Sequence, residues 1–384
     1  MDRIIYLDNA ATSYPKPESV YAAVSRTMRE AGGNPGRSGH RLAMAANGVV
    51  NDARMMCARL FGAERPDRIV FTANTTAALN IALKGLLSAG DHVITSSLEH
   101  NSVARPLHAL QQKGVEVTKI PTDINSGLRP GEIHKALRPN TRLVVCCHIS
   151  NVTGTVNDVA AIGTFCRENG LTFLVDAAQS AGTRRINVAE MKIDLLAFPG
   201  HKGLMGVQGT GGLYIKPGVK INALTQGGTG SNSERLEQPE TMPEKFESGT
   251  LNTPGLAGLA EGVRFVLEQG EAEIANREDA LVKRLLEGLK EIKGITYIGP
   301  EPGNDRGSAI SLRMGNMDPA QAALMLDSAF NIAVRSGLHC AADAHRTAGT
   351  LERGGTLRVS PGYFNNEEDI DQCLMALSIC AKGL

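Results

Sequence analysis

The pattern of hydrophobic and polar positions changes near residue 68. Before it, residues 18–61 carry apolar side chains at spacings of three and four, which predicts helices interrupted by a loop at 32–36. After it, short β-rich apolar runs alternate with helix-length segments. These runs are continuously hydrophobic, as are strands buried on both faces of a mostly parallel sheet. The expected strands are 68–72, 92–95, 143–148, 171–175, 193–198 and 212–215.

A smaller unit follows this α/β pattern, which extends to about residue 255. Two helical stretches, 256–269 and 272–293, lead into that unit. Its expected strands and helices are 308–313, 319–330, 332–335, 356–359 and 366–381. We therefore predict an α/β fold with three parts: an N-terminal segment 1–15 that packs with the small domain, a large domain 16–255 and a small C-terminal domain 256–384.

Composition narrows the class of function. The 384 residues include 40 basic and 40 acidic side chains, so neither nucleic acid nor a membrane surface is an expected partner. No secretory signal pattern is present, and no apolar run approaches the roughly 20 residues of a membrane helix. The seven cysteines lack regular spacing, which predicts free thiols in a cytoplasmic protein. No metal site is expected. Cys146, Cys147 and His148 resemble a metal cluster, but adjacent strand residues point to opposite faces and cannot bind one ion together.

The residues that follow the first three expected strands suggest where a ligand binds. Ligands of open parallel sheets bind beyond the carboxyl ends of the strands. Thr75 and Thr76 follow the first strand at a helix start, where free N–H groups favour a phosphate, although a plain N-cap is the common alternative. His100 follows the second strand and could stack on an aromatic cofactor or lie in a surface loop. Asn151 follows the third strand and could present an amide to a ligand.

An acid and an amine follow the next two strands. Asp176 comes directly after an apolar run, where a carboxylate is costly to bury without a cationic partner. Lys202 follows the next run, beside His201. Enzymes that use pyridoxal 5′-phosphate (PLP) need a lysine to form an imine with the cofactor and, in most folds, an acid that keeps its ring nitrogen protonated. Together, Asp176 and Lys202 predict a PLP enzyme.

Short motifs in one order cover nearly the whole chain. They are Tyr6–Ala11, Thr75–Thr76, Glu99–His100, Ser150–Asn151, Asp176–Gln179, Gly200–Lys202, Glu247–Thr250, Val334–Cys340 and Leu357–Ser360. This series resembles the class V aminotransferase family of PLP enzymes, fold type I. Within that family it is most similar to SufS-type (group II) cysteine desulfurases and their selenocysteine lyase relatives. The resemblance implies a large, mostly parallel, seven-stranded-type sheet domain, a smaller C-terminal α+β domain and a homodimer.

The resemblance also implies how the cofactor is held. Lys202 would link covalently to PLP and move the substrate Cα proton, while Asp176 would pair with the pyridinium. His100 would stack on the ring and take part in catalysis. The remaining cofactor contacts would come from Thr75, Thr76, Asn151, Gln179, His201 and, from the other subunit, Thr250. At Pro199 relatives commonly have a serine that donates to the phosphate, a role that segment 227–231 could take over.

The implied substrate is L-cysteine or L-selenocysteine. Arg358 would bind its carboxylate as a guanidinium fork, with Asn151, Ala11 and Arg335 also at the substrate. Cys340 would attack the substrate sulfur, giving L-alanine and a persulfide for a protein or small-molecule acceptor. The neighbours Arg335, His339 and His345 are expected to favour its thiolate form.

Other readings of the same motifs stay open. A selenocysteine lyase, a cysteine-sulfinate desulfinase or another class V activity could share the scaffold. A non-catalytic sulfur-relay scaffold is a further alternative, against which the intact pair of Lys202 and Asp176 argues. The segment between Cys340 and Arg358 does not match SufS-type sequences closely. Cys340 itself could instead be a small hydrophobic core residue.

Overall fold

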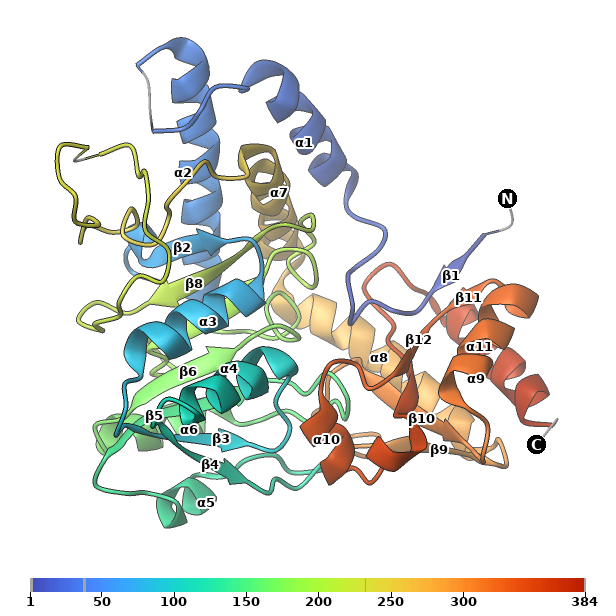
Figure 1. Ribbon diagram of the computed structural model, residues 1–384. Coiled ribbons are helices and arrows are strands. Elements are labelled where there is room, and N and C mark those ends of the chain that lie inside the picture. Colours follow the sequence, from blue (N-terminus) through green and yellow to red (C-terminus); the bar gives the residue numbers. More distant parts are fainter. Residues whose placement is uncertain (1–2, 37–38, 232, 383–384) are drawn as a thin grey trace.

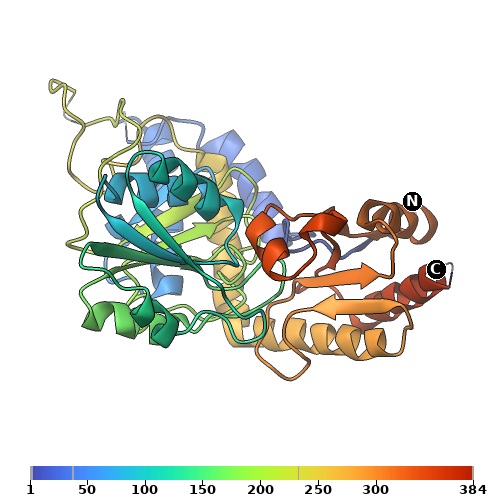
Figure 2. The same ribbon diagram turned by 60° about the horizontal axis from the view of Figure 1, so that its bottom comes forward.

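The computed structural model describes residues 3–36, 39–231 and 233–382. Figure 1 shows a large unit built around a central sheet and a smaller unit beside it that holds both ends of the chain. Figure 2 shows the same two units from below, with the loop between β8 and α7 projecting on the side away from the smaller one. Within the described residues, no helix is long and apolar enough to cross a membrane.

The large unit contains a seven-stranded sheet in the order β2-β8-β7-β6-β5-β3-β4. Strands β3 to β7 run parallel, and β8 runs antiparallel to both its neighbours. This confirms the mostly parallel sheet predicted from the continuous apolar runs. The strands are β2 (Ile69–Thr72), β3 (His92–Ser96), β4 (Glu116–Ile120), β5 (Thr141–Cys147), β6 (Thr172–Asp176), β7 (Leu195–Pro199) and β8 (Gly211–Ile215).

Six of these strands match the predicted runs within a few residues, and β4 is the one that was missed. The physical reason is its position at the edge of the sheet. Its sequence EVTKI is exposed or half-buried except at Ile120, so it lacks a continuous apolar signal. The helices α3 (Thr75–Leu86), α4 (Asn101–Gln111) and α6 (Val159–Glu168) contact strands of this sheet, and α5 (Pro130–Lys135) packs against α6.

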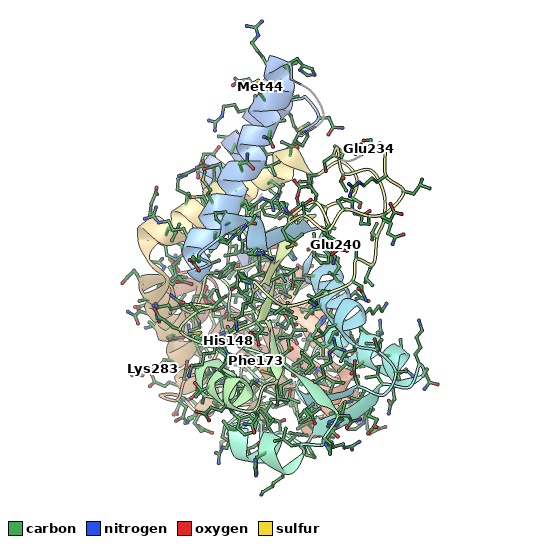
Figure 3. All side chains as sticks on the ribbon, turned by 90° about the vertical axis from the view of Figure 1, so that its left-hand side faces the viewer. Met44, His148, Phe173, Glu234, Glu240 and Lys283 are labelled. Atoms are coloured by element: carbon green, nitrogen blue, oxygen red, sulfur yellow. The ribbon has the colours of Figure 1, made fainter. Side chains whose placement is uncertain are left out.

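Three long helices complete the large unit. α7 (Thr253–Gln269) packs against α1 (Glu18–Glu30) and α2 (Arg41–Phe61). α7 adds apolar residues such as Leu259 to the core cluster that contains Phe173 of the sheet. Figure 3 shows Phe173 within the molecule and Met44 near the outer end of α2.

The smaller unit contains a four-stranded antiparallel sheet in the order β12-β13-β10-β9. α8 (Glu271–Lys290) joins the two units, since Ile274 packs in the large core and Leu285 in the small one. The N-terminal strand β1 (Ile5–Tyr6) pairs in parallel with β11 (Ile332–Ala333). The other elements are β9 (Ile295–Ile298), β10 (Ile310–Met314), α9 (Pro319–Phe330), β12 (Arg335–Gly337), α10 (Ala342–Thr347), β13 (Thr356–Val359) and α11 (Glu367–Ala381).

Candidate active site

A pocket of about 100 Å³ lies beyond the carboxyl ends of the central strands. Open parallel sheets place their ligand sites at this edge. The loops after β2, β3, β5, β6 and β7 all contribute to the pocket, so residues distant in sequence meet there. Its lining residues are Asn74, Thr75, Thr76, His100, Ser102, Cys147, Ile149, Asn151, Asp176, Ala178, Gln179, Pro199, His201 and Lys202.

Asp176 and Lys202 face this pocket from neighbouring strands. Asp176 ends β6 and is only 2% exposed, and its Oδ1 accepts a 2.9 Å hydrogen bond from the Ala178 N–H. Burial raises the pKa of Asp176 to about 6. Burial, followed by the charge of Arg358, lowers the pKa of Lys202 to about 8, against the opposing effect of Asp176. The amine and the carboxylate therefore interact electrostatically within one pocket.

His100 is held by a short chain of polar groups. It is the N-cap of α4, and its Nδ1 accepts the Ser102 N–H at 3.0 Å. The Ser102 hydroxyl lies 2.9 Å from the same Nδ1 and 2.7 Å from the Thr76 hydroxyl. Burial lowers the pKa of His100 to about 4, so the ring is neutral near pH 7. Because Nδ1 accepts a backbone N–H, the proton of the neutral ring lies on Nε2.

The donors at the other end of the pocket fit a phosphate. Thr75 starts α3, and its buried Oγ1 has no hydrogen-bond partner among the described residues. The same is true of the buried His201 Nδ1. A helix N-terminus with free hydroxyl and imidazole groups is suited to an anion, and buried polar atoms are normally paired. With Lys202 and Asp176 available for the aldehyde and the ring nitrogen, the residues present fit PLP.

The N-terminal segment fixes the turn that carries Lys202. The His201 carbonyl accepts hydrogen bonds from the Thr12 hydroxyl at 2.9 Å and from Lys16 Nζ at 2.7 Å. Gln179 Nε2 donates to the Ala10 carbonyl at 3.0 Å. Ala11 follows within this segment but is not among the lining residues. The N-terminal segment therefore supports Gln179 and the turn of His201, without lining the pocket itself.

Cys340 lies in a turn that contacts the large unit next to the pocket. Of the seven cysteines, all within the described ranges, six are buried and Cys340 is exposed. Its carbonyl accepts a 2.7 Å hydrogen bond from the N–H of Asn101, the residue after His100. Asn151 Nδ2 donates to the His339 carbonyl, also at 2.7 Å. Arg335 Nη2 lies 3.7 Å from the Cys340 Sγ atom.

Arg358 is buried between the two units. Only 1% of it is exposed, and its Nη2 donates to Asp8 Oδ1 at 2.7 Å. Its Nη1 donates to the Asn151 carbonyl at 3.2 Å, whereas its buried Nε has no hydrogen-bond partner among the described residues. Neither Arg358 nor Arg335 is among the pocket lining, although both charges act on Lys202.

Comparison with known proteins decides the family. The profile described as Aminotransferase class-V matches residues 5–373. The chain belongs to the class-V aminotransferase family. A probable cysteine desulfurase of Methanothermobacter thermautotrophicus is 38% identical over 95% of this chain and 92% of its own length. One from Pyrococcus abyssi is 35% identical over 99% and 95%.

Solved structures agree with this assignment. The apo cysteine desulfurase of Thermococcus onnurineus NA1 matches this class-V chain with a TM-score of 0.89 and 33% identity, covering 99% of this chain and 95% of its own. The cysteine desulfurase CsdA of Escherichia coli has the same TM-score and coverage at 27% identity. The resemblance to class V aminotransferases and to cysteine desulfurases, and the fold it implied, are therefore confirmed.

One expectation about Cys340 is wrong. Burial and the nearby charge of Arg358 lower the pKa of His339 to about 2 and that of His345 to about 4. Both rings are neutral near pH 7, so these histidines add no positive charge that would favour a thiolate. Arg335 is the cation that contacts Sγ.

Two predicted cofactor contacts lie away from the pocket of this class-V chain. Thr250 is exposed, and its hydroxyl accepts a 3.3 Å hydrogen bond from Asn34 Nδ2. Segment 227–231, offered as a substitute for the missing serine at Pro199, is also absent from the lining residues. Gly228 and Gly249 both lie in the long loop before α7, where the Gly249 N–H donates to the Gly228 carbonyl at 2.9 Å.

Sequence reasoning missed Ser102 at the pocket. It lines the wall between Thr76 and His100, and its hydroxyl contacts both side chains. A signal was available, because Ser102 lies two residues after His100 in the first turn of α4. Cys147 and Ile149 line the pocket as well, but their apolar strand context gave no such signal.

Proposed function

We propose that this class-V aminotransferase chain is a PLP-dependent cysteine desulfurase that converts L-cysteine to L-alanine and holds the sulfur on Cys340 as a persulfide. One observation carries the proposal. Lys202 and Asp176 line a single pocket, and the turn with the exposed thiol of Cys340 accepts a hydrogen bond from Asn101, next to that pocket. The relatives named cysteine desulfurase, similar over nearly their whole length, support it.

Different pocket residues would contact different parts of the cofactor. Thr75, Thr76 and His201 would hold the phosphate, and Gln179 would contact the ring hydroxyl. When bound, PLP supplies an aldehyde for the substrate amine and a pyridine ring that withdraws electrons from the substrate Cα. Asp176 would keep the ring nitrogen protonated, and His100 would lie against the ring face. Support comes from the lining of the pocket and from the buried Thr75 Oγ1 and His201 Nδ1, which have no hydrogen-bond partner among the described residues.

Lys202 would act first as the covalent anchor and then as the base. Its lowered pKa of about 8 gives a substantial neutral fraction at mildly alkaline pH, where an ordinary lysine is almost fully charged. The neutral amine would accept the Cα proton of cysteine and return it to the product. Asp176, with a pKa of about 6, stays ionised in the same pH range and can pair with a cation.

The sulfur step belongs to Cys340. Its thiolate would attack the substrate sulfur, so that a new S–S bond forms and the C–S bond of cysteine breaks. The carbon fragment takes up protons and leaves as alanine, so that cysteine and an enzyme thiol give alanine and an enzyme persulfide. Arg358 would bind the substrate carboxylate, with Arg335 close to the reacting sulfur. A later acceptor, protein or small molecule, would take the sulfur.

We propose a cytoplasmic homodimer in which Thr250 reaches the phosphate site of the partner. The proposal is supported by the location of Thr250, which is exposed on the long loop and separate from the pocket of its own chain. It also follows the family resemblance given by the Glu247–Thr250 motif.

Two experiments test the proposed function. The purified protein should be yellow, and borohydride should fix the cofactor to Lys202, as read by peptide mass spectrometry. Incubation with L-cysteine and a reductant should then give alanine and sulfide in equal amounts. A colourless protein that takes up no PLP contradicts the enzyme assignment. A yellow protein that releases no alanine contradicts the reaction.

A further inference from the structure

Two consecutive residues of the Cys340 turn have a left-handed backbone. His339 has φ of 48° and Cys340 has φ of 57°. Residues with a Cβ adopt this region at a cost, and usually one at a time. Such a conformation persists only where the surrounding structure holds it, and it is common at functional sites. The contacts that hold this turn are therefore of functional interest.

The large unit holds the turn through the carbonyls of these same two residues. Asn101 donates its backbone N–H to the Cys340 carbonyl, and Asn151 donates Nδ2 to the His339 carbonyl, both at 2.7 Å. Asn151 is 7% exposed, so little water competes for its amide. Since the Asn101 donor is main chain, Asn151 supplies the side-chain contact that a substitution can remove.

The His339 ring is fixed by a directed chain of hydrogen bonds. A carbonyl oxygen can only accept a hydrogen bond, so the Ser311 hydroxyl must donate to the Val152 carbonyl, at 2.7 Å. The Thr356 hydroxyl must therefore donate to Ser311 at 3.0 Å and accept from His339 Nε2–H at 3.0 Å. The chain returns to Val152, the neighbour of Asn151, so the turn is tied twice to one short segment of the large unit.

We propose that Asn151 is a positioning residue for Cys340, because its carboxamide holds the left-handed turn that presents the thiol to the pocket. This inference rests on the proposed function, since it takes Cys340 as the sulfur acceptor. It adds a task to the contacts with cofactor and substrate expected of Asn151. The Asn151 carbonyl also accepts Arg358 Nη1, so one residue joins the arginine expected to bind the substrate carboxylate to the nucleophile.

Hydrogen exchange tests the inference without requiring turnover. The reporter is the Ala341 amide, which donates to the Leu338 carbonyl at 2.9 Å within the turn. We expect Asn151→Ala to speed exchange of this amide about tenfold, because the variant loses one buried hydrogen bond that holds the turn closed. Asn157→Ala is the matched control, because Asn157 is fully buried and donates Nδ2 to the Cys147 carbonyl at 2.6 Å. It should leave the exchange of the turn unchanged.

Exchange at Ala341 that stays unchanged in Asn151→Ala, or that rises equally in Asn157→Ala, overturns the inference. Should Asn151→Ala fail to fold, Asn151→Asp provides the same test, because it keeps the side-chain shape and removes the Nδ2 donor. The same accelerated exchange is expected for it.

A second test separates positioning from cofactor contact. Glycine adopts left-handed φ without a steric penalty, so His339→Gly should make the turn less dependent on Asn151. We expect Asn151→Ala to slow sulfur transfer from cysteine about tenfold in the natural background and at most about threefold in the His339→Gly background. An equal loss in both backgrounds overturns the inference. Failure of the proposed function looks different: Cys340→Ala would keep releasing sulfur, while exchange at Ala341 would still respond to Asn151.

Discussion

The two halves of the site differ in how their side chains are positioned. In the pocket half, Asp176 ends one buried parallel strand and Lys202 follows its neighbour, so the edge of the sheet brings them together. In the other half, Cys340 and Arg358 depend on distant segments. Asn151 holds the turn of Cys340, and Asp8 from the N-terminal segment pairs with Arg358. The fold positions the first half, whereas individual hydrogen bonds position the second.

The largest effect is expected in the pocket half, at Lys202. Lys202→Ala removes the amine that anchors the cofactor and accepts the Cα proton, so alanine formation should fall by about 10³-fold or more. Borohydride should no longer attach the cofactor to the chain, while PLP still binds reversibly. Peptide mass spectrometry and an alanine assay measure the two effects. Covalent attachment at another lysine in this variant would contradict the assigned role.

Cys340→Ala tests the second half directly. We expect sulfur release from L-cysteine to fall by about 10²-fold, with PLP absorbance unchanged, because the thiol is outside the pocket lining. Turnover of selenocysteine, whose leaving group departs more easily, should fall less. Parallel assays with the two substrates check this, and full sulfur release from cysteine by the variant would exclude Cys340 as the acceptor.

Arg358 should affect substrate binding more than cofactor binding. Arg358→Lys keeps the charge and loses the planar fork, so KM for cysteine should rise about tenfold while the affinity for PLP is kept. Asp8→Asn, which weakens the 2.7 Å ion pair with Arg358, should raise KM by a smaller factor. Steady-state kinetics with a PLP titration separate the two constants. A KM that stays unchanged in Arg358→Lys would place the carboxylate elsewhere.

The last prediction concerns the pH dependence of stability rather than activity, at Glu99 beside the pocket. Glu99 is 1% exposed, its Oε1 accepts from the Ser96 hydroxyl and the Cys147 N–H, and burial raises its pKa to about 8. A raised carboxyl pKa stabilises the fold below the ordinary value of 4.5, and this contribution is lost as pH rises towards 8. Glu99→Gln should reduce the pH-dependent loss in the free energy of unfolding by about 1–3 kcal/mol.

Denaturant unfolding at a series of pH values checks this prediction. An equally steep loss of stability between pH 4.5 and pH 8 in Glu99→Gln would show that Glu99 does not titrate in this range.

The pocket half was largely predictable because buried strands can be recognised in the sequence as continuous apolar runs. The residue that follows such a run lies at the ligand edge, which is how Asp176 could be located. The edge strand β4 escaped, since EVTKI lacks that signal. The pairing of Arg358 with Asp8 joins residues 350 positions apart, and no local pattern encodes it. The neutral state of His339 likewise depends on burial, which its neighbours in sequence do not reveal.

The most direct test of the account follows the sulfur atom itself. The PLP-loaded protein is mixed with one equivalent of L-cysteine carrying radioactive sulfur and digested without reductant. The account predicts label on the peptide containing Cys340, removed by dithiothreitol, with one alanine for each labelled sulfur. Label on a different cysteine, or alanine formed with no label on the protein, would contradict it.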